Sequence, residues 1–104
     1  MKGKKAELRV ASSLRRTGAS VKLSPGSRGS ADMVAKWSGG KQWLSQVKYS
    51  GSGKPAGLSS KEKRNLLARA KRNNATPVLA QVTPAKITYL SAKTGRKLKP
   101  RKQQ

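Results

Sequence analysis

The first apolar positions of the chain recur at helical spacing. Between residues 4 and 16, Val10, Ala11 and Leu14 form an apolar stripe, and mostly basic or polar residues surround them. Gly18 follows this stretch, and a glycine just past the last periodic residue is a common helix end. The pattern therefore predicts a helix over residues 4–16 with one buried face.

Three extended segments follow this helix. Apolar and polar residues alternate over residues 19–23, which predicts a short strand. Ser, Pro and Gly are frequent in residues 24–30, so this stretch is predicted to be a loop. Two further extended runs, residues 31–37 and 41–49, flank Ser38-Gly39-Gly40. Extended runs on both sides of such a turn are typical of a β-hairpin.

The length of the hairpin turn decides which side chains share a face of the sheet. If three residues connect the strands, Trp37 faces Lys41 and Asp32 lies opposite Gln46. Lys48, two residues after Gln46, then points to the same face. A two-residue turn would instead place these side chains on opposite faces.

A second helix and two more strands are predicted in the second half of the chain. Ser59 and Glu62 have the spacing of a capping box, which predicts a helix over residues 59–73. Residues 76–82 form an apolar run typical of a buried strand, and residues 87–90 predict another strand. A turn follows at residues 93–95.

These elements predict one α/β domain over residues 1–95, with the order helix, strand, strand, strand, helix, strand, strand. A chain of 104 residues supports a single small core. The Gly/Ser-rich residues 50–57 are predicted to be a loop before the second helix. Residues 96–104 are rich in Lys and Arg and have little to bury, so they are predicted to be a basic, disordered tail.

The charge balance points to a polyanionic partner. The chain has 25 Lys and Arg residues but only 3 Asp and Glu residues, a formal net charge of +22. Nucleic acid is the commonest polyanion in cells, so DNA or RNA is the expected partner. The chain has no His and no Cys, which excludes zinc fingers, haem ligation and Ser-His or Cys-His catalysis. Because its apolar stretches are short, we expect no membrane association and an intracellular location, in the cytoplasm or with the nucleoid.

With so few acidic residues, each one needs an explanation. The capping box explains Glu62, which we assign no catalytic role. Glu7 lies on the same helical face as the apolar stripe, where a carboxylate is costly unless it has a partner. That partner is either a metal ion or a neighbouring cation such as Lys4 or Lys5.

Asp32, Gln46 and Lys48 form a candidate hydrolytic site together with Glu7. Carboxylate and amide oxygens are the ligands that Mg²⁺ prefers. A bound ion could polarise a phosphate and activate water, while the ammonium of Lys48 stabilises the negative charge of the transition state. These parts fit phosphodiester hydrolysis. The same short pattern is also typical of solvated polar positions on a half-exposed strand.

Short motifs between residues 2 and 48, together with the order and type of the elements over residues 2–82, support the first interpretation. They are Lys2-Gly3-Lys4-Lys5-Ala6-Glu7, then Val10 and Leu14, the Gly/Ser loop, Ala31-Asp32-Met33-Val34-Ala35, and Gln46-Val47-Lys48. Together they resemble the archaeal-type Holliday junction resolvases of the PD-(D/E)xK nuclease superfamily. The resemblance implies a restriction-endonuclease-like fold, with a mixed central sheet flanked by helices, and a homodimer that cuts four-way DNA junctions.

The resemblance also implies the roles of the site residues. Glu7, Asp32 and position 46 would surround Mg²⁺, or Mn²⁺ in its place. Lys48 would be the catalytic lysine, acting with Asp32 and Glu7. Ala31 stands where the family usually has proline, and Gln46 stands where it usually has an acid, which removes a full negative charge from the metal site.

Two alternatives stay open beside a junction resolvase. The first alternative is an Mrr-like or other DNA nuclease. Mrr-like restriction nucleases of the same superfamily carry Gln-x-Lys, as this chain does at Gln46 and Lys48. The second is a non-catalytic basic protein that binds nucleic acid through charge alone.

Basic residues near the candidate site are the expected DNA contacts. Lys5, Arg9, Arg28 and Lys54 flank the site in the predicted fold and are expected to contact phosphates. The resemblance adds Ser30 in the first Gly/Ser loop.

Overall fold

The computed structural model describes residues 2–23, 32–51 and 57–99, so the predicted loop 24–30 and most of the predicted loop 50–57 lie outside it. Within the described residues, two helices and six strands follow one another along the chain. They are α1 (Lys2–Arg16), β1 (Ser20–Leu23), β2 (Met33–Lys36), β3 (Gln42–Tyr49), α2 (Ser60–Arg72), β4 (Thr76–Val82), β5 (Ile87–Ser91) and β6 (Lys97–Leu98).

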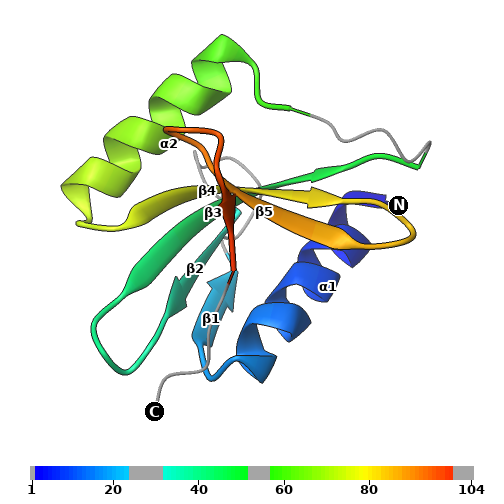
Figure 1. Cartoon of the computed structure of the whole chain (residues 1–104), viewed down its shortest axis with the longest axis horizontal. Coiled ribbons are helices and arrows are strands. Elements are labelled where there is room, and N and C mark those ends of the chain that lie inside the picture. The colour runs from blue at the N-terminus through cyan, green and yellow to red at the C-terminus, as the bar shows by residue number, and fades with distance from the viewer. Residues whose placement is uncertain (1, 24–31, 52–56, 100–104) are drawn as a thin grey trace.

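The strands form one mixed sheet in the order β1-β2-β3-β4-β5-β6. The strands β3 and β4, which α2 connects, run parallel, and the other neighbouring pairs are antiparallel. Figure 1 shows α1 and α2 on opposite faces of the sheet. The predicted fold class, a mixed central sheet flanked by helices, is therefore confirmed, and the predicted element order is correct through β5.

The larger part of the core lies between α1 and the sheet. Val10, Ala11 and Leu14 are fully buried, as the helical pattern predicts. They belong to one cluster with Trp37 and Trp43, whose rings meet edge to face with centroids 5.1 Å apart. Fully burying a Val or Leu side chain contributes about 1.5–3 kcal/mol. The apolar stripe therefore anchors α1 to the sheet.

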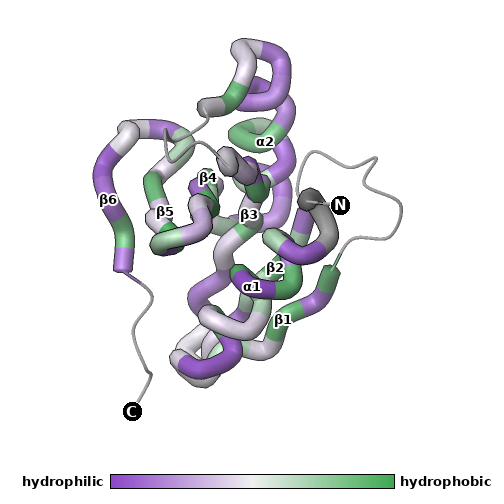
Figure 2. Tube along the Cα trace, turned by 90° about the vertical axis from the view of Figure 1, so that its right-hand side faces the viewer, coloured by the Kyte–Doolittle hydropathy of each residue, from purple (hydrophilic) through white to green (hydrophobic). Residues whose placement is uncertain are grey.

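A smaller cluster lies between α2 and the opposite face of the sheet. Leu66 and Ala70 of α2 pack with Leu44 of β3, and Figure 2 shows α2 mostly in the hydrophilic colour. Trp43 packs on the α1 side, and successive side chains of a strand point to opposite faces. The even-numbered positions of β3, which include Gln46, therefore face α2.

Both helices end at a residue in the left-handed backbone region. Gly18 has a φ of 94°, and the N–H of Ala19 behind it donates to the oxygen of Leu14 at 3.3 Å. Asn74, with a φ of 54°, occupies the equivalent place after α2. This type of helix end satisfies a carbonyl of the last turn. The predicted stop at Gly18 is thus confirmed.

The hairpin of β2 and β3 has the register expected for a three-residue turn, and the two-residue alternative is excluded. The N–H of Trp37 donates to the oxygen of Lys41 at 2.9 Å, and Met33 pairs with Ser45. Gly40, in the turn, has a φ of 90°, a conformation that glycine adopts without strain. The three-residue connection therefore continues the ladder toward Asp32 opposite Gln46.

The predicted start of a disordered tail at Arg96 is wrong. The turn around Gly95, which has a φ of 79°, brings the chain back to β5, where Leu98 pairs with Tyr89. Leu98 is also half-buried against the α1-side cluster. The short strand β6 therefore extends the ordered domain to about residue 98, because one apolar side chain after the turn finds a place against the core. Residues 100–104 lie outside the described residues.

Candidate active site

Polar side chains gather on the α2 side of the sheet, where β2 begins and β3 approaches its end. Asp32 immediately precedes β2, and Gln46 and Lys48 are neighbours on the α2 side of β3. The structure therefore brings together three residues that the hairpin register predicted to share a face.

Asp32 is held by the backbone of β3. Its own N–H donates to the oxygen of Ser45 at 2.8 Å, and its Oδ2 accepts the N–H of Val47 at 2.8 Å. The carboxylate thus takes the place of a backbone acceptor at the point where the hairpin ladder ends. Because Val47 lies between Gln46 and Lys48, this hydrogen bond fixes the carboxylate beside both residues.

Burial makes the charge of Asp32 expensive. Only 8% of the residue is exposed, and this desolvation raises the pKa of its carboxyl above the ordinary value of 3.8. The Val47 N–H and the positive charge of Lys48 act in the opposite direction, while the negative charge of Glu62 raises the pKa further. A bound cation would relieve this cost. Asp32 is therefore the residue of the site that gains most from one.

Lys48 makes an ion pair that the sequence interpretation missed. Its Nζ lies 2.6 Å from Oε2 of Glu62, in the first turn of α2, and the two side chains are about one-third exposed. This contact is the main reason that the pKa of the Glu62 carboxyl lies below its ordinary range. The assignment of Glu62 to helix capping alone is thus incomplete.

The capping box itself is confirmed. Oε1 of Glu62 accepts the N–H of Ser59 at 2.9 Å, and the Ser59 hydroxyl accepts the N–H of Glu62 at 3.2 Å. One carboxylate therefore binds the helix start through Oε1 and Lys48 through Oε2. The sequence recorded one part of this contact, because the two-residue period of a strand puts Lys48 on the same face of β3 as Leu44. The crossing of helix and strand that brings Glu62 to Lys48 could not be read from spacing.

Glu7 lies on the other side of the sheet, half-buried on α1. It lies two residues before Arg9, whose Nη1 donates to the oxygen of Thr83 at 2.9 Å. Thr83 directly follows β4, and Lys48 of the parallel strand β3 pairs with Gln81. Arg9 and Lys48 therefore lie at the same end of the sheet, and Glu7 is on the helix that passes this end. The role of Glu7 in the metal site stays a prediction.

The donors at this end suit a hard cation. Asp32 and Gln46 offer a carboxylate and an amide oxygen, the ligand types that Mg²⁺ takes alongside several water molecules. The described residues contain no group of three or more Asp, Glu, His or Cys side chains that could hold a metal ion. A site built here would therefore use few protein carboxylates, and its charge would come mainly from the buried Asp32.

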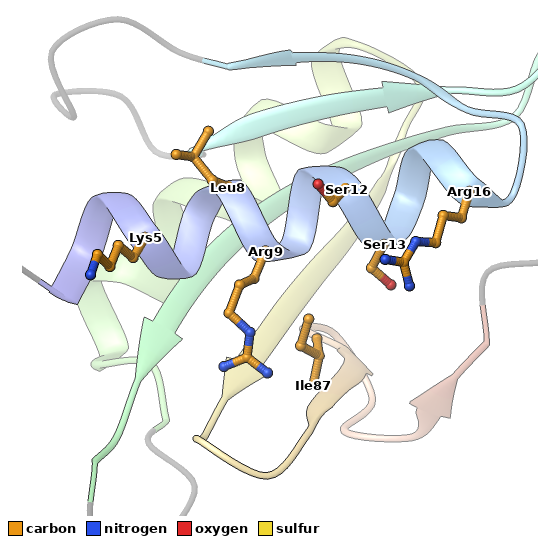
Figure 3. A pocket seen from close by; sticks show the side chains of 7 residues that line it. All are labelled: Lys5, Leu8, Arg9, Ser12, Ser13, Arg16 and Ile87. Atoms are coloured by element: carbon orange, nitrogen blue, oxygen red, sulfur yellow. The ribbon is translucent and has the colours of Figure 1, made fainter.

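A basic groove of about 690 Å³ runs along α1 beside the start of β5 (Figure 3). Arg9 and Arg16 reach into the space beside α1, with Ile87 of β5 on the other side. The full lining is Lys5, Leu8, Arg9, Ser12, Ser13, Arg16 and Ile87. Two of the predicted DNA contacts, Lys5 and Arg9, thus share a groove that also contains Arg16, which the sequence analysis did not single out.

Three of the predicted DNA contacts belong to the two Gly/Ser-rich segments. Arg28, Ser30 and Lys54 lie outside the described residues. Their proposed roles stay predictions.

Comparison with known proteins supports the fold. No protein-family model matches the chain, and no curated protein matches it. The structure is similar to that of Hjc from Archaeoglobus fulgidus, a Holliday junction resolvase from an archaeal hyperthermophile. The TM-score is 0.77 at 22% sequence identity, and the match covers 88% of this chain and 73% of Hjc. The chain therefore has the restriction-endonuclease-like fold of Hjc. Neither described helix has the length and apolar character needed to cross a bilayer.

Proposed function

We propose that the protein is a metal-dependent DNA endonuclease that resolves four-way junctions. The observation that carries the proposal is the placement of a buried carboxylate, Asp32, beside Gln46 and Lys48 on the fold that Hjc has. A net charge of +22 supports DNA as the partner, because neutralising phosphates releases their counterions.

The roles of the site residues follow from their chemistry. Asp32 and Gln46 would hold Mg²⁺, with Glu7 as a third candidate ligand from α1. When bound, the ion would polarise the scissile phosphate and acidify a water molecule. The Nζ of Lys48 would donate to a phosphate oxygen as negative charge develops there. The backbone of β3 orients Asp32 for this work through the N–H of Val47.

The groove along α1 would contact the DNA backbone. Arg9 lies at the same end of the sheet as Lys48, and its hydrogen bond to Thr83 fixes the guanidinium there. From Lys5 to Arg16, α1 spans about 16 Å at 1.5 Å per residue. That is long enough to meet more than one phosphate of a strand. An arm of a junction could therefore contact this groove while its scissile phosphate lies near Lys48.

Selectivity for junctions would come from a homodimer. A charge of +22 binds any duplex, and this binding weakens steeply with salt without favouring junctions. Two active sites at a fixed separation match two strands of a four-way junction and only one of a linear duplex. Sedimentation of the free protein tests the dimer directly.

The test of the function is cleavage of a labelled four-way junction with and without Mg²⁺. The wild-type protein should cut the junction only with the metal and should prefer it over excess duplex of the same sequence near physiological salt. Asp32→Asn and Lys48→Ala should each abolish cleavage while junction affinity changes little, because most of the affinity comes from other cations.

The result would also separate the two alternatives. Metal-dependent cleavage without junction preference would favour an Mrr-like or other DNA nuclease. Tight binding with no cleavage under any metal would favour the non-catalytic nucleic-acid-binding protein. A variant at Asp32 or Lys48 that cuts at the wild-type rate would remove the site assignment.

A further inference from the structure

We propose that Glu62 is a positioning residue of the candidate active site, which holds the Lys48 ammonium beside Asp32 through its own negative charge. The proposal rests on the proposed nuclease function and adds a residue from α2 to a site otherwise built from β2, β3 and α1. Its basis is the 2.6 Å contact between Lys48 Nζ and Glu62 Oε2.

Lys48 needs such a partner to stay in one place. A lysine side chain has a flexible four-carbon stem, and its strongly hydrated ammonium normally extends into solvent. Asp32 attracts it, but the Asp32 carboxylate is buried and already accepts the N–H of Val47. Glu62, in the first turn of α2, provides an acceptor within hydrogen-bond distance of the ammonium. The charges of Lys48 and Glu62 both act on the Asp32 carboxyl, so the three groups are close neighbours.

Glu62 is itself rigidly placed. Its Oε1 accepts the backbone N–H of Ser59 at 2.9 Å, a hydrogen bond that does not need the Ser59 hydroxyl. Leu66, one turn later in α2, is fully buried in the α2-side cluster. The carboxylate that binds Lys48 is therefore attached to an anchored helix end and not to a free surface side chain.

Helix capping does not require the negative charge. A capping box accepts Gln as well as Glu at this position, because only one side-chain oxygen has to receive the backbone N–H. A carboxylate has a second acceptor oxygen, and here that oxygen binds Lys48. An amide has a single oxygen and no charge, so it would bind the ammonium more weakly. The ion pair, and not the hydrogen bonds of the cap, is therefore the contact that depends on the negative charge of residue 62.

The ion pair contributes little to the free energy of unfolding. Both side chains are about one-third exposed, and solvent screening leaves such pairs with a small net contribution to folding. Its main physical consequence is local: it restricts where the ammonium that lowers the pKa of Asp32 can lie. For a transition state that demands a donor at a defined position, such restriction raises the rate.

Two variants separate positioning from capping. Glu62→Gln keeps an oxygen for the cap and removes the charge that binds Lys48. Ser59→Ala is the matched control, because it removes the hydroxyl half of the cap and leaves the backbone N–H and the Glu62 carboxylate in place. We expect Ser59→Ala to lower the melting temperature by about 4–8 °C, the effect of a lost helix cap in a domain of this size.

The first readout is junction cleavage under single-turnover conditions with saturating Mg²⁺, together with junction affinity. Glu62→Gln should cut about 10- to 100-fold more slowly than wild type, the effect of a misplaced catalytic group, with affinity within about twofold. Ser59→Ala should cut within about twofold of the wild-type rate at a temperature where both are folded. The proposal would be overturned if Glu62→Gln cut the junction at the wild-type rate. It would also be overturned if the cleavage rate fell as much in Ser59→Ala as in Glu62→Gln.

The second readout does not depend on activity. A lysine ammonium held by a carboxylate gives an observable proton–nitrogen NMR signal, whereas a freely hydrated one exchanges its protons too fast. The Lys48 signal, assigned by its absence in Lys48→Ala, should be present in wild type and Ser59→Ala and lost in Glu62→Gln. If the wild-type protein does not cut the junction, the proposed function is wrong, and the NMR readout still tests whether Glu62 positions Lys48. A Lys48 signal that is unchanged in Glu62→Gln would overturn the role of Glu62.

Discussion

Replacing Asp32 by Asn should make the protein more stable while it abolishes cleavage. Asp32 is 8% exposed, and the net effect of its surroundings raises the pKa of its carboxyl. A raised pKa means that folding is less favourable with the carboxyl ionised than with the carboxyl neutral. Asn is a neutral side chain of the same shape, and its Oδ1 can still accept the N–H of Val47.

The expected gain is about 1 kcal/mol in the free energy of unfolding at pH 7, the scale on which burying a polar group costs stability in proteins. Four contributions set its sign. The variant removes the desolvation cost and the repulsion from Glu62, whereas it weakens the hydrogen bond from the Val47 N–H and loses the attraction to Lys48. Desolvation is the largest of these influences. For a domain of about 100 residues, 1 kcal/mol corresponds to a rise of about 4–8 °C in melting temperature.

The difference should depend on pH in a defined direction. The pKa of Asp32 is higher in the folded than in the unfolded protein. The contribution of the neutral carboxyl to the free energy of unfolding is therefore fully present below about pH 3.8 and is lost as the pH rises through the folded pKa. The neutral amide of the Asp32→Asn variant has no such dependence. The two proteins should therefore differ little in stability below pH 3.8, and the variant should gain its full advantage above the folded pKa.

Urea denaturation of both proteins between pH 3 and pH 8, without divalent metal, measures this difference. Added Mg²⁺ should then raise the stability of the wild type by about 1.4 kcal/mol at ten times its dissociation constant, and should leave Asp32→Asn nearly unchanged. A variant that is less stable than wild type at pH 7 by more than 1 kcal/mol would refute the reasoning. It would show that the carboxylate contributes to the fold through contacts other than those described.

Two further predictions concern the metal and the DNA. Gln46→Glu should lower the Mg²⁺ concentration for half-maximal cleavage about tenfold, because a carboxylate adds a full charge to the oxygen ligands; an unchanged metal dependence would show that residue 46 does not contact the ion. Arg16→Ala should weaken junction binding and reduce the slope of log affinity against log salt by about one. The control Arg96→Ala, in the exposed turn before β6, should change neither, and an equal effect of both variants would mean that the α1 groove is not a preferred DNA contact.

The sequence alone predicted the elements through β5, and it reduced the hairpin register to a choice between a three-residue and a two-residue turn. Gly18 ends α1, and three turn residues set the register of β2 and β3 that brings Asp32 beside Gln46, because helix ends and hairpin turns depend on local backbone conformation. Once the register is known, the two-residue period of a strand assigns Gln46 and Lys48 to one face. The larger part of the candidate site therefore follows from contacts near in sequence.

The tertiary structure decided what these local patterns meet in space. Lys48 binds Glu62 because α2 crosses β3 with its first turn next to Lys48. That crossing depends on how Leu66 and Leu44 pack in the same cluster. The basic groove, likewise, exists because α1 lies beside Ile87 of β5, far away in the chain. Such contacts depend on the angle and offset between packed elements. Side-chain volumes in the core set these quantities, and residue spacing along the chain does not record them.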